Sequence, residues 1–93
     1  MTEPSAAATL AVTVVTPEGT AWVGRAVAVS VPAANVSLGI LPRRQPLATE
    51  LGRGLVRTTV VAGETVELVV SGGFVVVDTD EVTVIADAIL PER

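Results

Sequence analysis

Four acidic side chains near the end of the sequence are its first candidates for chemistry. Asp78, Asp80, Glu81 and Asp87 fall close together, and carboxylates bind calcium or act in pairs as general acid and base. Their spacing lacks the glycine and the terminal bidentate glutamate of an EF-hand loop, and acids between two strands are usually solvated turn residues. We expect a turn here and no metal site, while a small enzyme that uses Asp78, Asp80 or Asp87 stays as an alternative.

The remaining catalytic repertoire is small. The sequence contains no cysteine and no histidine, and all six basic residues are arginine. Thiol nucleophiles, cysteine or histidine metal ligands, Schiff bases and a phosphate-binding lysine are therefore excluded. Ser71 has no histidine, cysteine or lysine that could activate it. We expect a chain that is not itself an enzyme and that binds no cofactor.

Three further features suit binding as well as structure. Arg43 and Arg44 can hold a phosphate or a carboxylate through their planar guanidinium groups, and the apolar, proline-containing loop around them favours a role beyond a simple connection. Gly72 and Gly73 could form a phosphate nest, but no helix start follows, so a bulge or a close approach of two backbones is expected. Trp22, the single tryptophan, fits an interface anchor or the core equally well.

Composition narrows the class of protein. The chain has 93 residues, of which 49% are hydrophobic and 17% charged, which suits one folded domain. The net charge of −4 without a basic stripe argues against a nucleic-acid partner. The first residues lack the basic region of a secretory signal, and the longest uncharged stretch is too short and too interrupted to span a bilayer. We expect a cytoplasmic chain with no direct membrane insertion.

The hydrophobic pattern predicts strands throughout. Nineteen valines, eleven threonines and three isoleucines favour sheet over helix, and no helical period competes. Pro32 is expected to end one strand, because proline removes a ladder donor. We predict an all-β sandwich of two packed antiparallel sheets over residues 10–90, a flexible lead-in over 1–9 and a short end over 91–93. Strands are expected at 10–15, 21–23, 26–31, 55–61, 66–70 and 82–86.

Four sequence segments, taken in order and with their spacing, carry a resemblance to a known family. The chain resembles the N-terminal domain of the ε subunit of the F-type ATP synthase from about Leu10 to Ala88. The segments are VVTPEG (14–19), LGILP followed by PL (38–42 and 46–47), SGGFVVV (71–77) and VTVIAD (82–87).

This resemblance implies a fold and a role. The fold would be a ten-stranded β-sandwich without substantial helix. The domain would belong to the central stalk of the rotor, bound to the γ subunit on one side and resting on the c-ring at one end. It would couple proton translocation to ATP synthesis without catalysing a reaction, as a peripheral component at the cytoplasmic face of a bacterial plasma membrane. The motif residues that carry over as structural are Gly39, Pro42, Pro46, Gly72 and Gly73.

The sequence also departs from the family pattern. The family usually has Gly-Glu before Leu-Gly-Ile, where this chain has Val36 and Ser37, so one expected polar contact with the c-ring is weakened. The family's Gly-His-Ala between the two prolines is Arg43-Arg44-Gln45 here. We expect the contact with the ring to be rebuilt around the arginines, with a ring-facing loop formed by Ser37, Leu38, Arg43 and Arg44.

The C-terminal end leaves two possibilities open. Family members usually continue into a two-helix hairpin that inhibits ATP hydrolysis, whereas this sequence ends at Pro91-Glu92-Arg93. A complete natural chain would lack that inhibitory latch, and a piece of a longer protein would merely leave it out. A different class of function also stays open, a stand-alone β-sandwich interaction or ligand-binding module.

Overall fold

The computed structural model describes residues 9–33 and 36–91, and these residues form nine β-strands and no helix. No membrane-spanning helix is therefore present in this part of the chain. The all-β prediction is confirmed, with nine strands in place of ten. The strands are β1 (Leu10–Thr16), β2 (Gly19–Ala33), β3 (Val36–Ile40), β4 (Leu47–Leu51), β5 (Gly54–Val60), β6 (Thr65–Val70), β7 (Gly73–Asp78), β8 (Glu81–Ala86) and β9 (Ile89–Leu90).

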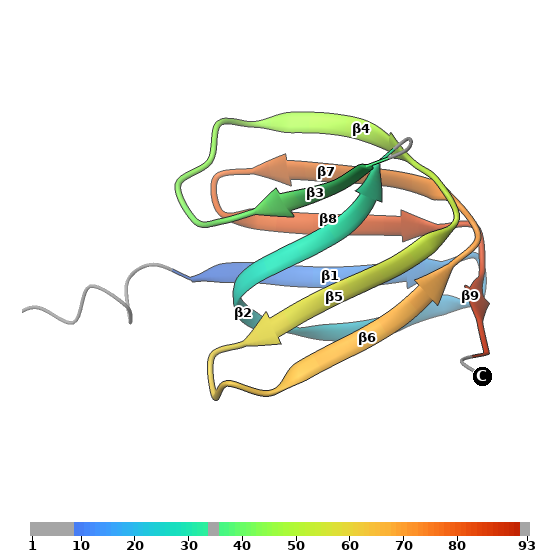
Figure 1. The fold of residues 1–93 in the computed structure, drawn as a ribbon, viewed down its shortest axis with the longest axis horizontal. Coiled ribbons are helices and arrows are strands. Elements are labelled where there is room, and N and C mark those ends of the chain that lie inside the picture. The colour runs from blue at the N-terminus through green and yellow to red at the C-terminus, as the bar shows by residue number, and fades with distance from the viewer. Residues whose placement is uncertain (1–8, 34–35, 92–93) are drawn as a thin grey trace, which may run out of the picture.

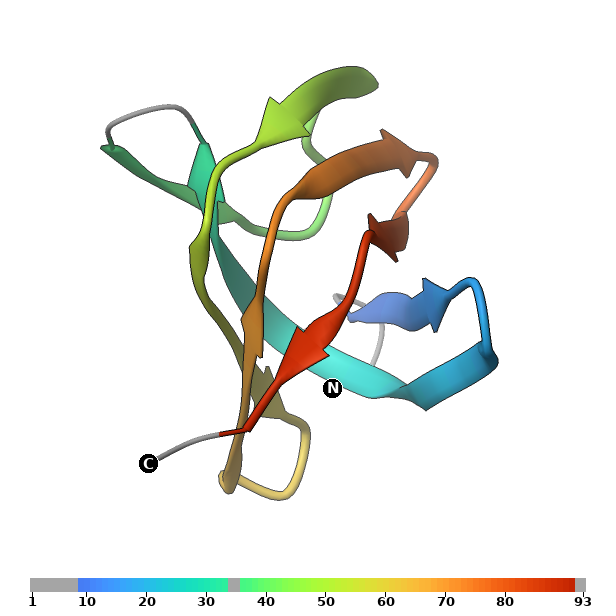
Figure 2. The same ribbon diagram turned by 90° about the vertical axis from the view of Figure 1, so that its right-hand side faces the viewer.

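The strands form two layers that share one long strand. Hydrogen bonds connect them in the order β4-β7-β8-β1-β2-β5-β6-β9, and β3 also pairs with β2. The first half of β2 pairs with β1, and its second half pairs with β3 and β5, so β2 passes from one layer to the other. The two views show the layer β4-β7-β8-β1 facing the layer β3-β2-β5-β6 (Figures 1 and 2).

One pairing is parallel, which differs from the expected antiparallel sheets. β1 and β8 run in the same direction, with Val12 beside Val82 and Val14 beside Val84. A parallel pair cannot be joined by a hairpin, and here most of the chain separates the two strands. Local turn signals fix only the direction of neighbouring strands, so this pairing was not visible in the sequence.

The structure also corrects the prediction that Pro32 ends a strand. The expected short strands at 21–23 and 26–31 are one strand, which continues past Pro32 to Ala33. The Pro32 carbonyl accepts a hydrogen bond from the Gly52 amide at 2.8 Å and so points away from β3. The nitrogen of a strand residue faces the same side as its carbonyl, so the N–H that proline lacks is not needed in the ladder with β3.

The core lies between the inner faces of the two layers. Burial alternates along the strands, most regularly in β7, where every second side chain is buried. Because valine is stiff at χ1, a core built mainly of valine packs with few alternative rotamers. The buried cluster comprises Leu10, Val12, Val14, Ala26, Val29, Val31, Ile40, Leu51, Val56, Val70, Val75, Val77, Val82, Val84 and Ala86.

Gly73 begins β7 where two backbones approach closely. Its φ is +136°, and a Cβ there would collide with the carbonyl oxygen of Ile85 on β8. Only glycine combines that backbone conformation with that contact. The second glycine, Gly72, lies in the preceding turn and accepts a hydrogen bond from the Asp87 amide at 2.9 Å.

The start of the domain lies one residue earlier than the sequence suggested. Thr9, which was assigned to the lead-in, is buried, and its hydroxyl accepts hydrogen bonds from the Arg25 guanidinium at 2.7 and 3.1 Å. Residues 1–8 and 92–93 of the predicted terminal segments lie outside the described residues.

Candidate interaction surfaces

The outer side of the β4-β7-β8-β1 layer exposes an unusual amount of apolar side chain. Phe74 is 54% exposed, Ile85 44% and Val76 39%, while Val75 and Val84 point inward and are fully buried. These positions share a face because side chains alternate along a strand. Phe74 lies directly opposite Ile85 in the β7–β8 ladder.

The same face continues across β1 to β2. Val15 is the neighbour of Ile85 in the parallel ladder, and Thr13 is the neighbour of Val23, which is 65% exposed. Thr13 and Val15 are half-buried. We call this surface the outer apolar face. It comprises Thr13, Val15, Val23, Phe74, Val76, Thr83 and Ile85.

Acidic side chains surround the outer apolar face. Glu50 on β4 is the cross-strand partner of Phe74, and Asp78 and Glu81 face each other at one end of the β7–β8 hairpin. Asp87 directly follows β8, at the opposite end of the β7–β8 hairpin from Asp78 and Glu81. On the β2 side of the face the border carries a basic residue, Arg25. A complementary surface would be apolar with a basic border.

A second surface is the loop between β3 and β4, which lies at the same end of the sandwich as the β7–β8 turn (Figure 1). Arg43 has a φ of +69°, and its amide donates a hydrogen bond to Oδ1 of Asp80 at 2.6 Å. Leu41, Arg43 and Arg44 are exposed. A shallow hollow of about 380 Å³ lies beside them, lined by Arg44, Gln45, Pro46 and Leu47.

The residues expected to form one ring-facing loop lie on different surfaces. Ser37 is exposed, near the start of β3, and its hydroxyl is 2.6 Å from that of Ser30. Leu38 points to the opposite face of β3 and packs against the core. Arg43 and Arg44 follow the other end of β3, up to roughly 20 Å from Ser37 at about 3.3 Å per residue.

Three of the motif residues expected to be structural, Gly39, Pro42 and Pro46, lie in or next to this loop. Gly39 is exposed on the outer face of β3, opposite Ser30, and nothing lies within 4 Å of the position of a Cβ there. Pro42 occupies the turn that leads to Arg43, and Pro46 is exposed just before β4. The prolines therefore restrict the backbone on both sides of the arginine pair.

The acidic residues do not converge on a catalytic or metal-binding centre. Asp80 and Asp87 lie at opposite ends of β8, on the order of 20 Å apart at about 3.3 Å per residue. In the described residues no three His, Cys, Asp or Glu side chains gather as a metal site would require. Thr79 and Asp80 both have positive φ, as the two central residues of a type I′ hairpin turn do, in agreement with the expected turn.

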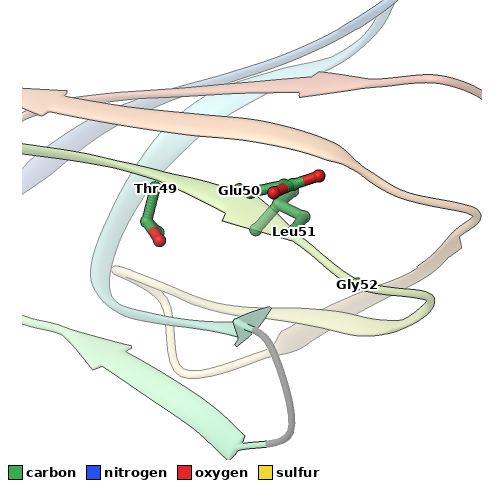
Figure 3. A pocket seen from close by; sticks show the side chains of 4 residues that line it. All are labelled: Thr49, Glu50, Leu51 and Gly52. Carbon is green, nitrogen blue, oxygen red and sulfur yellow. The ribbon is translucent and has the colours of Figure 1, made fainter.

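A second hollow, of about 410 Å³, lies at the end of β4 (Figure 3). Thr49 and Leu51 come from the inward side of the strand and Glu50 from the outward side, with Gly52 beyond them. The hollow offers one carboxylate and one hydroxyl, and no buried side-chain polar atom of the described residues lacks a hydrogen-bond partner. Nothing in it resembles an acid–base or nucleophilic arrangement.

Comparison with known proteins agrees with this geometry. Residues 9–92 match the family described as ATP synthase, Delta/Epsilon chain, beta-sandwich domain. The chain belongs to this family. The ATP synthase epsilon chain of Halalkalibacterium halodurans is 51% identical over 81 residues, covering 86% of this chain and 59% of the relative. That of Desulfitobacterium hafniense is 39% identical over 85 residues, covering 91% and 64%. The chain thus spans about three-fifths of these delta/epsilon relatives.

Solved structures share the delta/epsilon fold at low identity. A chain of the Euglena gracilis mitochondrial ATP synthase superposes with a TM-score of 0.82 at 19% identity, covering 89% of this chain and 53% of its own length. A chain from the central stalk and c-ring of the Tetrahymena thermophila mitochondrial ATP synthase gives a TM-score of 0.69 at 17% identity, covering 87% and 65%. The sandwich architecture is therefore that of known ATP synthase components.

Sequence reasoning missed the outer apolar face. Strands β7 and β8 carry apolar residues on both faces, which is usual for strands covered on both sides. Among the residues that the structure describes, no element covers the outer side of this layer (Figure 2). A strand with two apolar faces in a domain too small to cover both was the signal that could have revealed this surface.

Proposed function

We propose that this chain is a non-catalytic subunit of the central stalk of an F-type ATP synthase. In this role it links the γ subunit to the c-ring and helps couple proton translocation to ATP synthesis, as a peripheral component at the cytoplasmic face of the bacterial membrane. The match of residues 9–92 to the delta/epsilon β-sandwich family carries this proposal. A stiff valine-rich sandwich suits a part that transmits torque.

We propose the outer apolar face as the contact with γ. Phe74, Val76 and Ile85 form a contiguous patch on adjacent strands, and isolated domains rarely leave such patches uncovered. The acids around it favour a partner whose apolar surface has a basic border. Phe74 lies between Ile85 and the bordering Glu50, and an exposed aromatic side chain in such a patch is the type of residue that dominates binding energy.

Binding to purified γ subunit of the same organism, measured by titration calorimetry, tests this contact. The unsubstituted chain is expected to bind with one-to-one stoichiometry. Phe74→Asp should weaken binding at least about tenfold, because it removes an aromatic anchor and buries a charge. Val61→Asp is the matched control, since Val61 is 55% exposed on the β5–β6 connection, outside this face. No binding by the folded chain at tens of micromolar would remove the role and leave a stand-alone interaction module.

Contact with the c-ring is proposed at one end of the sandwich. Ser37 lies near the start of β3, and the Arg43–Arg44 pair follows its end. A c-ring that rests on one end of the sandwich can therefore contact either Ser37 or the arginine pair, but not both. The chain contains no native cysteine, so Ser37→Cys and Arg44→Cys each introduce a single thiol. Disulfide formation with a cysteine in the polar loop of the c subunit is expected for one of the two. Cross-linking of neither would contradict the ring contact.

A further inference from the structure

Arg43 occupies a backbone conformation that normally requires glycine. It follows Pro42 in a turn. Proline at the first central residue and a positive φ at the second are the features of a type II turn, whose second central residue is usually glycine. A long side chain with a Cβ disfavours this left-handed region. Among the described residues only Arg43, Thr79 and Asp80 are non-glycine residues with positive φ.

The carboxylate of Asp80 compensates for this unfavourable conformation. Its Oδ1 accepts the Arg43 amide at 2.6 Å, a short, charge-assisted hydrogen bond between segments far apart in sequence. The backbone carbonyl of Asp80 also accepts the Ala11 amide at 2.9 Å. Asp80 therefore joins the β3–β4 loop to the β7–β8 turn and to the start of β1, and it holds the loop in one conformation.

The fixed loop presents two guanidinium groups to solvent. Arg43 and Arg44 are exposed, and the salt bridge found within residues 9–33 and 36–91 is Arg57–Glu67 on another surface. Leu41 beside them is 61% exposed. Two exposed guanidinium groups that have no carboxylate partner among the described residues, next to an apolar side chain, have the form of a docking site rather than of a solvated loop.

We propose that the β3–β4 loop, residues 41–46, is a preformed docking site for a carboxylate on a rotor subunit, and that Asp80 is its positioning residue. This inference rests on the proposed function. Guanidinium groups bind carboxylates through paired hydrogen bonds, which suits a discrete acidic side chain. A diffuse anionic membrane surface is a poorer partner, because the chain has a net charge of −4 and Asp78 and Glu81 lie at the same end.

The test compares binding of four variants to γ and to a γ–c-ring subcomplex. Arg43→Gln with Arg44→Gln removes both charges and should weaken binding about tenfold, mostly through faster dissociation. Asp80→Gly removes the carboxylate but keeps the type I′ turn, and should weaken binding several-fold, on the order of three to five, with both arginines present. Asp80→Asn keeps an acceptor oxygen and should restore most of the affinity. Glu64→Gln removes one negative charge from the β5–β6 turn, away from Arg43 and from the outer apolar face, and should leave binding unchanged.

Hydrogen exchange supplies the readout specific to positioning. The Arg43 amide should exchange faster in Asp80→Gly and remain protected in Glu64→Gln, while circular dichroism confirms that both variants fold. Equal binding of Asp80→Gly and the unsubstituted chain would overturn the role of Asp80.

Other outcomes separate this inference from the proposed function. Unchanged rotor binding by the double arginine variant would overturn the docking site while the stalk role stands. Failure of the unsubstituted chain to bind either complex would remove the stalk role itself. Binding of vesicles containing anionic phospholipid that depends on the arginines, without an effect on rotor binding, would assign the loop to lipid and contradict the carboxylate.

Discussion

Replacing Gly73 by alanine is expected to be among the most destabilising single-methyl additions in this domain. At φ +136° an L-residue is strained by about 1–3 kcal/mol. The added Cβ would also meet the Ile85 carbonyl oxygen, with the Cα of Ala86 3.0 Å away. Both neighbours are backbone, so β7 must shift at the Gly73–Ala86 pair and lose a ladder hydrogen bond of about 1 kcal/mol. The free energy of unfolding should fall by about 2–4 kcal/mol.

Two other glycines separate the contributions to this loss. Gly63 has a φ of +101° and nothing within 4 Å of a Cβ, so Gly63→Ala carries the dihedral strain alone, on the order of 1 kcal/mol. Gly39 has neither positive φ nor a near contact, so Gly39→Ala should change stability by less than about 0.5 kcal/mol or raise it slightly. Urea unfolding of the three variants, followed by the fluorescence of Trp22, measures the series. A loss for Gly73→Ala no larger than that for Gly63→Ala would refute the reasoning from the backbone collision.

Three further predictions concern packing and charge. Val84→Ala removes two methyl groups from a fully buried position and should lower the unfolding free energy by about 2–3 kcal/mol, measured by urea unfolding. Gly24→Ala places a methyl group against the indole of Trp22 and should shift its fluorescence maximum to longer wavelength as the ring moves outward; an unchanged spectrum would contradict the contact. The Arg57–Glu67 salt bridge, 2.8 Å long with side chains 56% and 35% exposed, should show a coupling below about 1 kcal/mol in a double-mutant cycle, decreasing further in high salt.

The fold class followed from local properties of the sequence. Alternation of valines places Val82 and Val84 on one face whatever their partner strand, and the Asp78–Glu81 turn was visible from its residue types. The parallel pairing of β1 with β8 and the continuation of β2 through Pro32 depend on contacts between distant segments. Local patterns do not encode such contacts.

The surfaces were predicted less completely than the fold. Arg43 and Arg44 drew attention as an exposed pair, but the Asp80 carboxylate that fixes the loop is 37 positions away from Arg43. Ile85 lies in a predicted strand and Phe74 in the SGGFVVV segment, yet their exposure depends on what the rest of the chain leaves uncovered. Sequence periodicity distinguishes the two faces of a strand, and only the packed structure tells which faces stay open to a partner.

Reconstitution of proton pumping tests the proposed rotor role most directly. ATP synthase of the same organism, depleted of its ε subunit and inserted into vesicles, would be supplied with the chain, with the Phe74→Asp variant or with the Val61→Asp control. We predict that the chain and the Val61→Asp control raise the number of protons translocated per ATP hydrolysed, and that Phe74→Asp does so only at much higher concentration. Folded chain that leaves coupling at the level of the depleted enzyme would contradict the account.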